Sequence, residues 1–207
     1  MEVIKIQQYK NNFNVVVKSG LSNQQIKEDR NYYPDVSKML VKSQELYKEN
    51  YVVDMNTENS FYSMLALSLG YENILSLKKT TEQLKHLKNS YILNDKMMDK
   101  DNTSQSIAEY NKMLKNKVCG FCIVSQLKDM RFCKRLFKEQ TIHHIVILNH
   151  SEEDADLIQY IQTQGYTDYS ITPKGNIRTN INTYDKYPLL LKANCSKVAD
   201  GIVVRFD

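Results

Sequence analysis

Short apolar segments separated by polar residues open the chain. Apolar residues recur at 3–6 and again at 13–17, with Asn11 and Asn12 between them. Two asparagines between apolar runs are typical of a turn, so this part predicts one or two short strands. Apolar residues then recur every three or four positions over residues 36–47, which predicts an amphipathic helix, followed by a short extended piece at 51–53.

The middle of the chain is dominated by helical periodicity. Residues 61–69 are apolar nearly all round, which predicts a helix buried on most of its faces, and Gly70 suits its carboxyl-terminal cap. A second helix, with one apolar stripe, is predicted from residue 77 to residue 91. Its lysines are expected on the outer face: Lys78, Lys79, Lys85 and Lys88.

The remainder of the chain, after a polar segment at 94–104 that predicts an exposed loop, contains most of the strand patterns. Helices are predicted at 106–114, at 126–138 and from Ser151 to Gly165, and strands at 142–148, 166–172, 189–191 and 201–206. Helices dominate the first two thirds, so the predicted class is α+β, with a small, mostly antiparallel sheet packed against helices. One domain over residues 1–207 is the simplest organisation, with residues 1–50 as an N-terminal strand and helix extension.

Composition and charge favour a soluble, intracellular protein. Of the 207 residues 42% are hydrophobic, and the formal net charge of +4 comes from basic and acidic side chains that are interspersed. That balance supports solubility more than binding to nucleic acid. No apolar run approaches the roughly 20 residues of a membrane span. The first residues also lack the pattern of a signal peptide, so no membrane association is expected.

Four cysteines lie at positions 119, 122, 133 and 195. Cys119 and Cys122 have the spacing of a redox motif, but that chemistry needs a helix start at the motif, and an apolar run follows instead. A zinc site would need a second regular pair, which the other cysteines and the histidines do not supply. Buried, reduced thiols are therefore predicted, with no metal and no cofactor.

The most informative segment extends from Val53 to Ala66. It changes abruptly from extended to helical, with Ser60 at the junction. A side chain at a helix start meets free backbone N–H groups and the positive end of the helix dipole. A hydroxyl there can cap the helix, which contributes about 1 kcal/mol. It can also act as a nucleophile near donors that stabilise a developing oxyanion.

The segment Asn59-Ser60-Phe61-Tyr62-Ser63, followed by Leu65-Ala66 and Gly70, resembles the nucleophile motif of the ovarian-tumour (OTU) family of deubiquitinating cysteine proteases. Later segments are similar to the family's in the same order. Asn182-Thr183-Tyr184-Asp185 lies where such proteases carry His-Tyr-Asp or His-Tyr-Asn, 123 positions after Ser60 (183 minus 60). The resemblance implies a papain-like, OTU-like fold.

The same resemblance implies that the catalytic positions have changed. Ser60 stands at the place of the cysteine, Thr183 at that of the histidine, and Thr57 in the pair that precedes the motif. Asn59 and Asp185 match family residues. Threonine cannot accept a proton near neutral pH, so the general base is missing. The implied protein is a catalytically inactive pseudoenzyme, not an active enzyme.

Such a domain would act by binding a protein partner, with ubiquitin or a related modifier as the partner that the resemblance implies. Tyrosines are enriched at interfaces. The binding residues expected around the vestigial cleft are Tyr62, Tyr184 and Tyr187.

Two alternatives stay open. One is an active OTU-type cysteine protease, a hydrolase, in which Ser60 replaces the natural cysteine and His143 or His144 serves as the base. The other is a nucleic-acid-associated protein, for which residues 166–175 offer a wing-like hairpin with Arg178 nearby.

Overall fold

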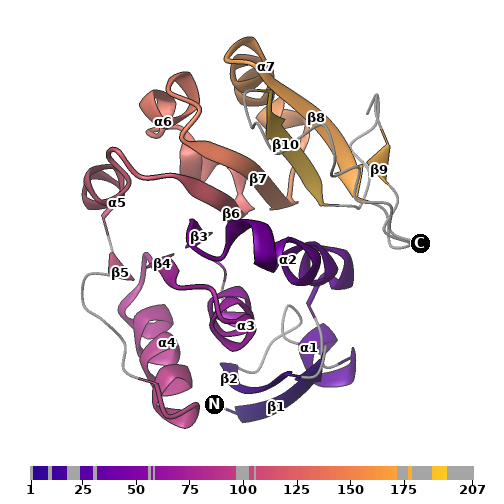
Figure 1. Ribbon diagram of the computed structural model, residues 1–207, viewed down its shortest axis with the longest axis vertical. Coiled ribbons are helices and arrows are strands. Elements are labelled where there is room, and N and C mark those ends of the chain that lie inside the picture. Colours follow the sequence, from indigo (N-terminus) through magenta and orange to yellow (C-terminus); the bar gives the residue numbers. More distant parts are fainter. Residues whose placement is uncertain are drawn as a thin grey trace.

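The computed structural model describes residues 2–8, 11–17, 24–29, 32–55, 57, 59–96, 103–104, 106–171, 177–178 and 188–194. Its centre is an eight-stranded sheet with the order β5-β4-β3-β6-β7-β10-β8-β9 (Figure 1). The strands of this sheet are β3 (Tyr51–Met55), β4 (Asn73–Leu77), β5 (Thr103–Ser104), β6 (Cys119–Gln126), β7 (Ile142–Asn149), β8 (Tyr166–Ile171), β9 (Ile177–Arg178) and β10 (Leu189–Ala193).

Five neighbouring strands of this sheet are parallel, and the other three alternate in direction. β3 pairs in parallel with β4 on one side and with β6 on the other, and the pairs β4–β5 and β6–β7 are also parallel. β10 then lies antiparallel between β7 and β8. The chain therefore builds outward from β3 to β5 and then returns to the other side of β3 to add β6. Chain order reverses at this point.

One face of the sheet is covered by the first four helices and a two-stranded hairpin. Strands β1 (Glu2–Gln8) and β2 (Asn11–Val17) pair antiparallel and form a small sheet of their own. β2 packs on α3 (Phe61–Leu69) and α4 (Thr81–Leu93). The backbone N–H of Asn14 donates to Asn94 Oδ1 (2.7 Å), and Asn94 Nδ2 donates to the carbonyl of Asn14 (2.8 Å). The helices are α1 (Gln24–Asp29), α2 (Pro34–Tyr47), α3 (Phe61–Leu69) and α4 (Thr81–Leu93).

The opposite face is covered by helices from the second half of the chain. Tyr110, Phe137 and Ile161, each from a different helix, share one hydrophobic cluster with the strands on this side. The helical segments of this half are α5 (Ile107–Met113), η3 (Leu127–Met130), α6 (Lys134–Lys138), η4 (Glu152–Asp154) and α7 (Ala155–Thr163).

The central strands are buried on both faces. Val52 belongs to the cluster on the α3 side and Val53 to the cluster on the α5 side, and neither is exposed. Ile123 and Val124 divide between the two clusters in the same way. Because both faces are covered, these strands read as continuous apolar runs, as parallel strands between helix layers do.

The prediction of an α+β fold with a small, mostly antiparallel sheet is wrong. The fold is α/β, with a large and largely parallel central sheet. The apolar pattern did not predict β4, and the helix predicted from residue 77 overlaps its last residue, Leu77. A short apolar run that is buried on both faces cannot be told from a buried helix by periodicity alone. The helix predicted at 126–138 is two short segments, η3 and α6, and residues 103–104 of the predicted loop form β5.

Predictions that rested on local chemistry are confirmed. α3 begins directly after Ser60 and ends at Gly70, whose left-handed backbone (φ 84°) suits glycine. Ser151 and Asp154 form a capping box at the predicted helix start. The strands predicted at 142–148, 166–172 and 189–191 are β7, β8 and β10. Residues 201–206 lie outside the described residues.

The prediction of buried, reduced thiols is confirmed for Cys119, Cys122 and Cys133. Burial raises the pKa of both Cys122 and Cys133 to about 12, so these thiols stay protonated at neutral pH. Cys195 lies outside the described residues.

The described residues contain no helix that combines the length and the apolar character needed to cross a membrane. The same part of the chain holds no cluster of three or more histidine, cysteine or acidic side chains that could bind a metal ion.

Candidate functional site at the carboxyl edge of the sheet

The carboxyl ends of β3, β4, β6 and β7 meet at one edge of the sheet. In open α/β sheets, ligands bind in the crevice outside the carboxyl ends of the strands, at the point where chain order reverses. In this protein that point lies between β3 and β6. The polar side chains at this edge are therefore the first candidates for a functional site.

A buried ion pair stands at this edge. Asp54 lies on β3, Lys78 follows directly after β4, and both side chains are fully buried, with 3.0 Å between Lys78 Nζ and Asp54 Oδ1. Lys78 Nζ also donates to the carbonyl of Thr57 (2.8 Å) and to Thr57 Oγ1 (3.3 Å). An ammonium group has three N–H donors, so these three contacts use all of them.

Hydroxyl groups complete the surroundings of the Asp54 carboxylate. Thr57 Oγ1 donates to Asp54 Oδ1, and Ser63 Oγ donates to Asp54 Oδ2 (2.5 Å). Ser76 Oγ lies 2.8 Å from Ser63 Oγ. Burial lowers the pKa of Lys78, whereas the charge of Asp54 and the hydrogen bond to it raise it. Both oxygens of the carboxylate are therefore engaged by the protein's own donors.

Sequence reasoning missed this pair. Lys78 was expected on the exposed face of a helix, which is wrong because β4 carries it into the interior. Asp54 offered a signal, since it is the only charged residue in the segment 51–55 and the rest of that segment predicts a strand. Fully buried charges almost always have a partner. The identity of that partner depended on the pairing of β3 with β4.

Ser60 lies where the loop after β3 enters α3. Its backbone is left-handed (φ 55°), which is uncommon for a residue other than glycine. Asn59 Oδ1 accepts the hydrogen bond from the backbone N–H of Phe61 (3.1 Å), and the Ser60 side chain makes no capping bond. Ser60 Oγ is fully buried and has no hydrogen-bond partner among the described residues. The predicted capping bond is therefore wrong, and a buried hydroxyl is left for a ligand.

A second buried oxygen of this kind lies on α2. Asp35, in the first turn of that helix, is 5% exposed, and its Oδ1 has no hydrogen-bond partner within the described part of the chain. Burial raises the pKa of Asp35, and the positive charge of Lys38 acts in the opposite direction. Leaving a buried carboxylate oxygen unpaired is costly, so Asp35 marks a place for a cation or a hydrogen-bond donor.

Tyr62 connects the environments of Asp35 and Ser60. It lies in the first turn of α3, two positions after Ser60, and its hydroxyl donates to the carbonyl of Tyr32 just before α2 (2.8 Å). Burial raises the pKa of Tyr62, and the negative charges of Asp54 and Asp35 add to that rise. The hydrogen bond to Tyr32 therefore ties the first turn of α3 to the segment just before α2.

The start of α2 is also tied to the carboxyl ends of β6 and β7. Tyr33 OH donates to Asn149 Oδ1 (3.1 Å), and Asn149 Nδ2 donates to the carbonyl of Ser125 (3.3 Å). Asn149 is the last residue of β7, and Ser125 is the last but one of β6. The first turn of α2 is thereby held beside the point where chain order reverses.

A second ion pair links the two sides of β3 at this edge. Lys79, after β4, pairs with Asp129 of η3, which follows β6. The side chain of Lys79 is 42% exposed and that of Asp129 is 3% exposed. Both lysines that follow β4 are thus bound to carboxylates of the protein itself.

The residues selected from the sequence fall into three groups. The structure brings together Thr57, Asn59, Ser60 and Tyr62 at the carboxyl edge. Thr183, Tyr184, Asp185 and Tyr187 lie outside the described residues. His143 and His144 lie near the amino end of β7, where His144 pairs with Phe121, so they belong to the opposite edge of the sheet.

His144 is a buried, neutral histidine. Its Nδ1 lies 3.0 Å from the carbonyl of Gly120, and its ring stacks on Phe121 with 4.8 Å between centroids. Burial lowers the pKa of His144 to about 4, which the contact with Gly120 partly offsets. His144 is therefore uncharged at neutral pH.

We expect this histidine to make the protein acid-sensitive. Between pH 6.5 and pH 4 the unfolded chain takes up a proton at residue 144 that the folded chain refuses, so stability falls as pH falls. The expected loss is about 3 kcal/mol of unfolding free energy between pH 7.5 and pH 4. Urea unfolding at several pH values measures it. His144→Gln should remove this part of the pH dependence and His150→Gln should keep it; equal slopes in all three proteins contradict the assignment.

Comparisons with known proteins find similarity of structure. No protein-family profile and no curated protein sequence matches the chain. A candidate SAM-dependent methyltransferase from Streptococcus mutans matches with a TM-score of 0.55 and 13% identity, over 93% of this chain and 56% of its own. SMU.776, a candidate methyltransferase complexed with SAH, matches with a TM-score of 0.51, 12% identity and the same coverages. The human methyltransferase 10 domain containing protein matches with a TM-score of 0.50 and 12% identity, over 78% and 80%.

These matches establish the fold, which is that of SAM-dependent methyltransferases. This chain spans just over half the length of the first of those proteins. The resemblance to OTU proteases and the papain-like fold are therefore wrong, because the solved structures that match are methyltransferases. The ubiquitin-binding pseudoenzyme and the active cysteine protease fall with that resemblance. The nucleic-acid-associated protein was predicted from the hairpin at 166–175, and the methyltransferase fold overturns it, because residues 166–171 form β8 of the central sheet. The expectation that the chain is not an active enzyme rested on the protease alignment, which the methyltransferase fold overturns.

The carboxyl edge fits a nucleoside cofactor in some respects and not in others. Doubly wound folds commonly hold such cofactors with a glycine-rich loop after the first strand and an acidic residue about 20 positions later. Residues 56–60 contain no glycine, and Lys78 stands 18 positions after Ser60 (78 minus 60). The loop without glycine and the lysine near the expected acidic position do not fit this way of binding a nucleoside cofactor. Asp35 and Ser60, with their unpaired buried oxygens, do fit a ligand that carries positive charge and hydrogen-bond donors.

Proposed function

We propose that this protein is a methyltransferase that binds S-adenosylmethionine at the carboxyl edge of β3, β4, β6 and β7. The observation that carries the proposal is the strand order, with the antiparallel β10 between β7 and β8 and the reversal of chain order at β3. Ser60 follows β3 at the edge where ligands of such sheets bind. The hydrogen bonds from Tyr33 to Asn149 and from Tyr62 to Tyr32 support a position of Asp35 near the same edge. The unpaired oxygens of Asp35 and Ser60 support a ligand site there.

The chemistry of the cofactor agrees with these acceptors. When bound, S-adenosylmethionine supplies a methyl group on a positively charged sulfonium. Asp35 would accept a hydrogen bond from the cofactor and offset its positive charge, and burial strengthens that attraction. Ser60 Oγ would accept a further hydrogen bond at the start of α3. Tyr33 and Asn149 would keep the first turn of α2 in place over the edge.

A binding measurement tests this proposal. S-adenosylhomocysteine and S-adenosylmethionine, each at about 100 times its dissociation constant, should raise the melting temperature by roughly 5–10 °C. NAD and ATP at the same concentrations should not. Absence of binding by calorimetry at about 1 mM of either cofactor would contradict the proposal.

Two variants connect the binding to the proposed residues. Asp35→Asn and Ser60→Ala should each weaken S-adenosylhomocysteine binding about tenfold or more, because each removes an acceptor or its charge. Asp156→Asn is the matched control, since Asp156 is an exposed aspartate in the first turn of α7. Ser68→Ala is the control for Ser60, because Ser68 lies on the same helix and donates to the carbonyl of Leu65. Unchanged affinity in both site variants contradicts their assignment.

A further inference from the structure

The end of β4 is where a ribose is usually recognised in a doubly wound sheet. There an acidic side chain accepts hydrogen bonds from the ribose hydroxyls of a nucleoside cofactor. In this protein β4 lies beside β3 with Met55 opposite Leu77, and the next residue is Lys78. The position that supplies a hydrogen-bond acceptor in other sheets therefore carries a cation here.

Lys78 has nothing left to offer a ribose. Its three donors are used by Asp54 Oδ1, the carbonyl of Thr57 and Thr57 Oγ1, and an ammonium group has no acceptor. The side chain is fully buried, so this geometry is enclosed by the protein.

The neighbouring carboxylates do not replace the missing acceptor. Asp54 is occupied by Lys78, Thr57 and Ser63. Asp129 is paired with Lys79. Among the residues that the structure describes, the two acidic groups nearest the ends of β3 and β6 are thus engaged in ion pairs within the protein.

We infer that this site binds its nucleoside cofactor without recognising the ribose 2′-hydroxyl, because the Asp54–Lys78–Thr57 cluster replaces the ribose acceptor. The inference rests on the proposed function and concerns the same site. The affinity for the cofactor then comes from the cofactor groups that bind Asp35 and Ser60 and from its adenine base. A cofactor that lacks the 2′-hydroxyl should bind as well as the natural one.

Calorimetry on the wild-type protein with two ligands tests the inference. The ligands are S-adenosylhomocysteine and its 2′-deoxyribose analogue, and their dissociation constants should agree within about threefold. A site that hydrogen-bonds a ligand hydroxyl rejects the analogue without it by at least about tenfold, because a buried acceptor is left unpaired. A preference of tenfold or more for the ribose form overturns the inference and leaves the proposed function intact. Absence of binding by both ligands overturns the two together.

A double variant tests the cause. Asp54→Asn combined with Lys78→Glu removes the ion pair and places an acceptor at the end of β4. This variant should prefer the ribose form by about tenfold or more. Lys88→Glu, which makes the same charge change at an exposed position on α4, should keep the wild-type ratio. If the double variant binds both ligands with the wild-type ratio, Lys78 is not the cause and the inference is overturned. If the double variant does not fold, the ratio of the two dissociation constants in the wild-type protein decides whether the inference holds.

Discussion

Replacing Lys78 with methionine is expected to lower the free energy of unfolding by about 3–5 kcal/mol, because it leaves the Asp54 carboxylate buried without its cation. Asp54 and Lys78 are both fully buried, with 3.0 Å between charged atoms, so water cannot take over the role of the ammonium group. Thr57 and Ser63 would still donate to Asp54, but neither carries a charge. Urea unfolding at pH 7 measures the loss.

Two further variants separate the charge effect from the loss of packing. Adding Asp54→Asn to Lys78→Met should recover most of the lost stability, because no unpaired charge is then buried. Lys79→Met should cost at most about 1 kcal/mol, since the side chain of Lys79 is 42% exposed and its pairing with Asp129 is weakened by solvent. If Lys78→Met and Lys79→Met cost the same, the buried pair does not stabilise the fold as described.

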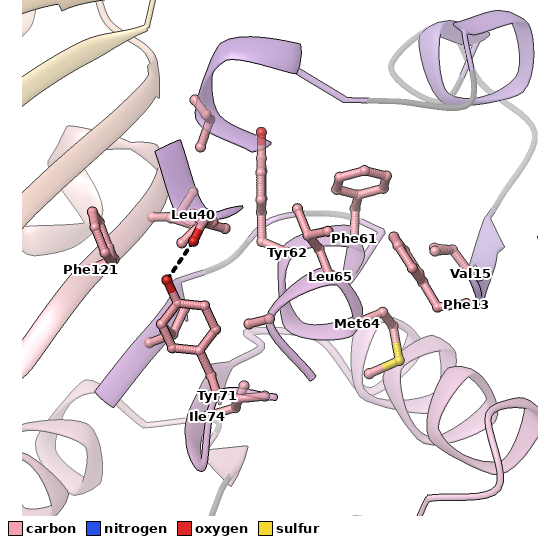
Figure 2. Packing of buried hydrophobic residues seen from close by; sticks show 14 of the residues in the cluster. Phe13, Val15, Leu40, Phe61, Tyr62, Met64, Leu65, Tyr71, Ile74 and Phe121 are labelled. Carbon is pink, nitrogen blue, oxygen red and sulfur yellow. Dashed lines mark hydrogen bonds between the residues drawn. The ribbon is translucent and has the colours of Figure 1, made fainter. Parts of the chain in front are cut away.

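Truncating Phe61 to alanine is expected to cost about 3–5 kcal/mol of unfolding free energy. Phe61 is fully buried at the start of α3, where Figure 2 shows it among the residues of the core on the hairpin side. Its ring meets Phe13 of β2 edge to face at 5.6 Å and Tyr62 at 5.4 Å. The change opens a cavity between α3 and the hairpin, which cannot collapse without moving β2.

Phe132→Ala is the matched control for that loss. Phe132 is 73% exposed, so the same chemical change should alter the free energy of unfolding by no more than about 0.5 kcal/mol. Chemical denaturation of both variants, with equal m-values, makes the comparison. A small effect of Phe61→Ala would mean that the hairpin is not packed on α3 in solution.

The sequence predicted the elements whose signals are local. The left-handed cap at Gly70, the capping box of Ser151 and Asp154, and the apolar run of β7 each depend on neighbours a few positions away. The junction at Ser60 was also identified, because the change from an extended segment to an apolar helix is visible in the chain. The function of this junction could not be predicted, because a change from extended to helical backbone is expected at the nucleophile of a protease and is also found after β3 in this sheet.

Only the tertiary structure decided which strands are neighbours and what lies at their ends. Parallel pairing joins residues far apart in the chain, as in the pairing of Met55 with Leu77 and with Val124. Strands buried on both faces show no alternation that could reveal this order. The same pairing converted Lys78 from an expected surface lysine into the buried partner of Asp54. Contacts of Tyr33 with Asn149 and of Tyr62 with Tyr32 hold the first turn of α2, which carries Asp35, near the Ser60 junction. Local chemistry thus determined where elements begin and end, whereas packing between distant segments determined the fold and the site.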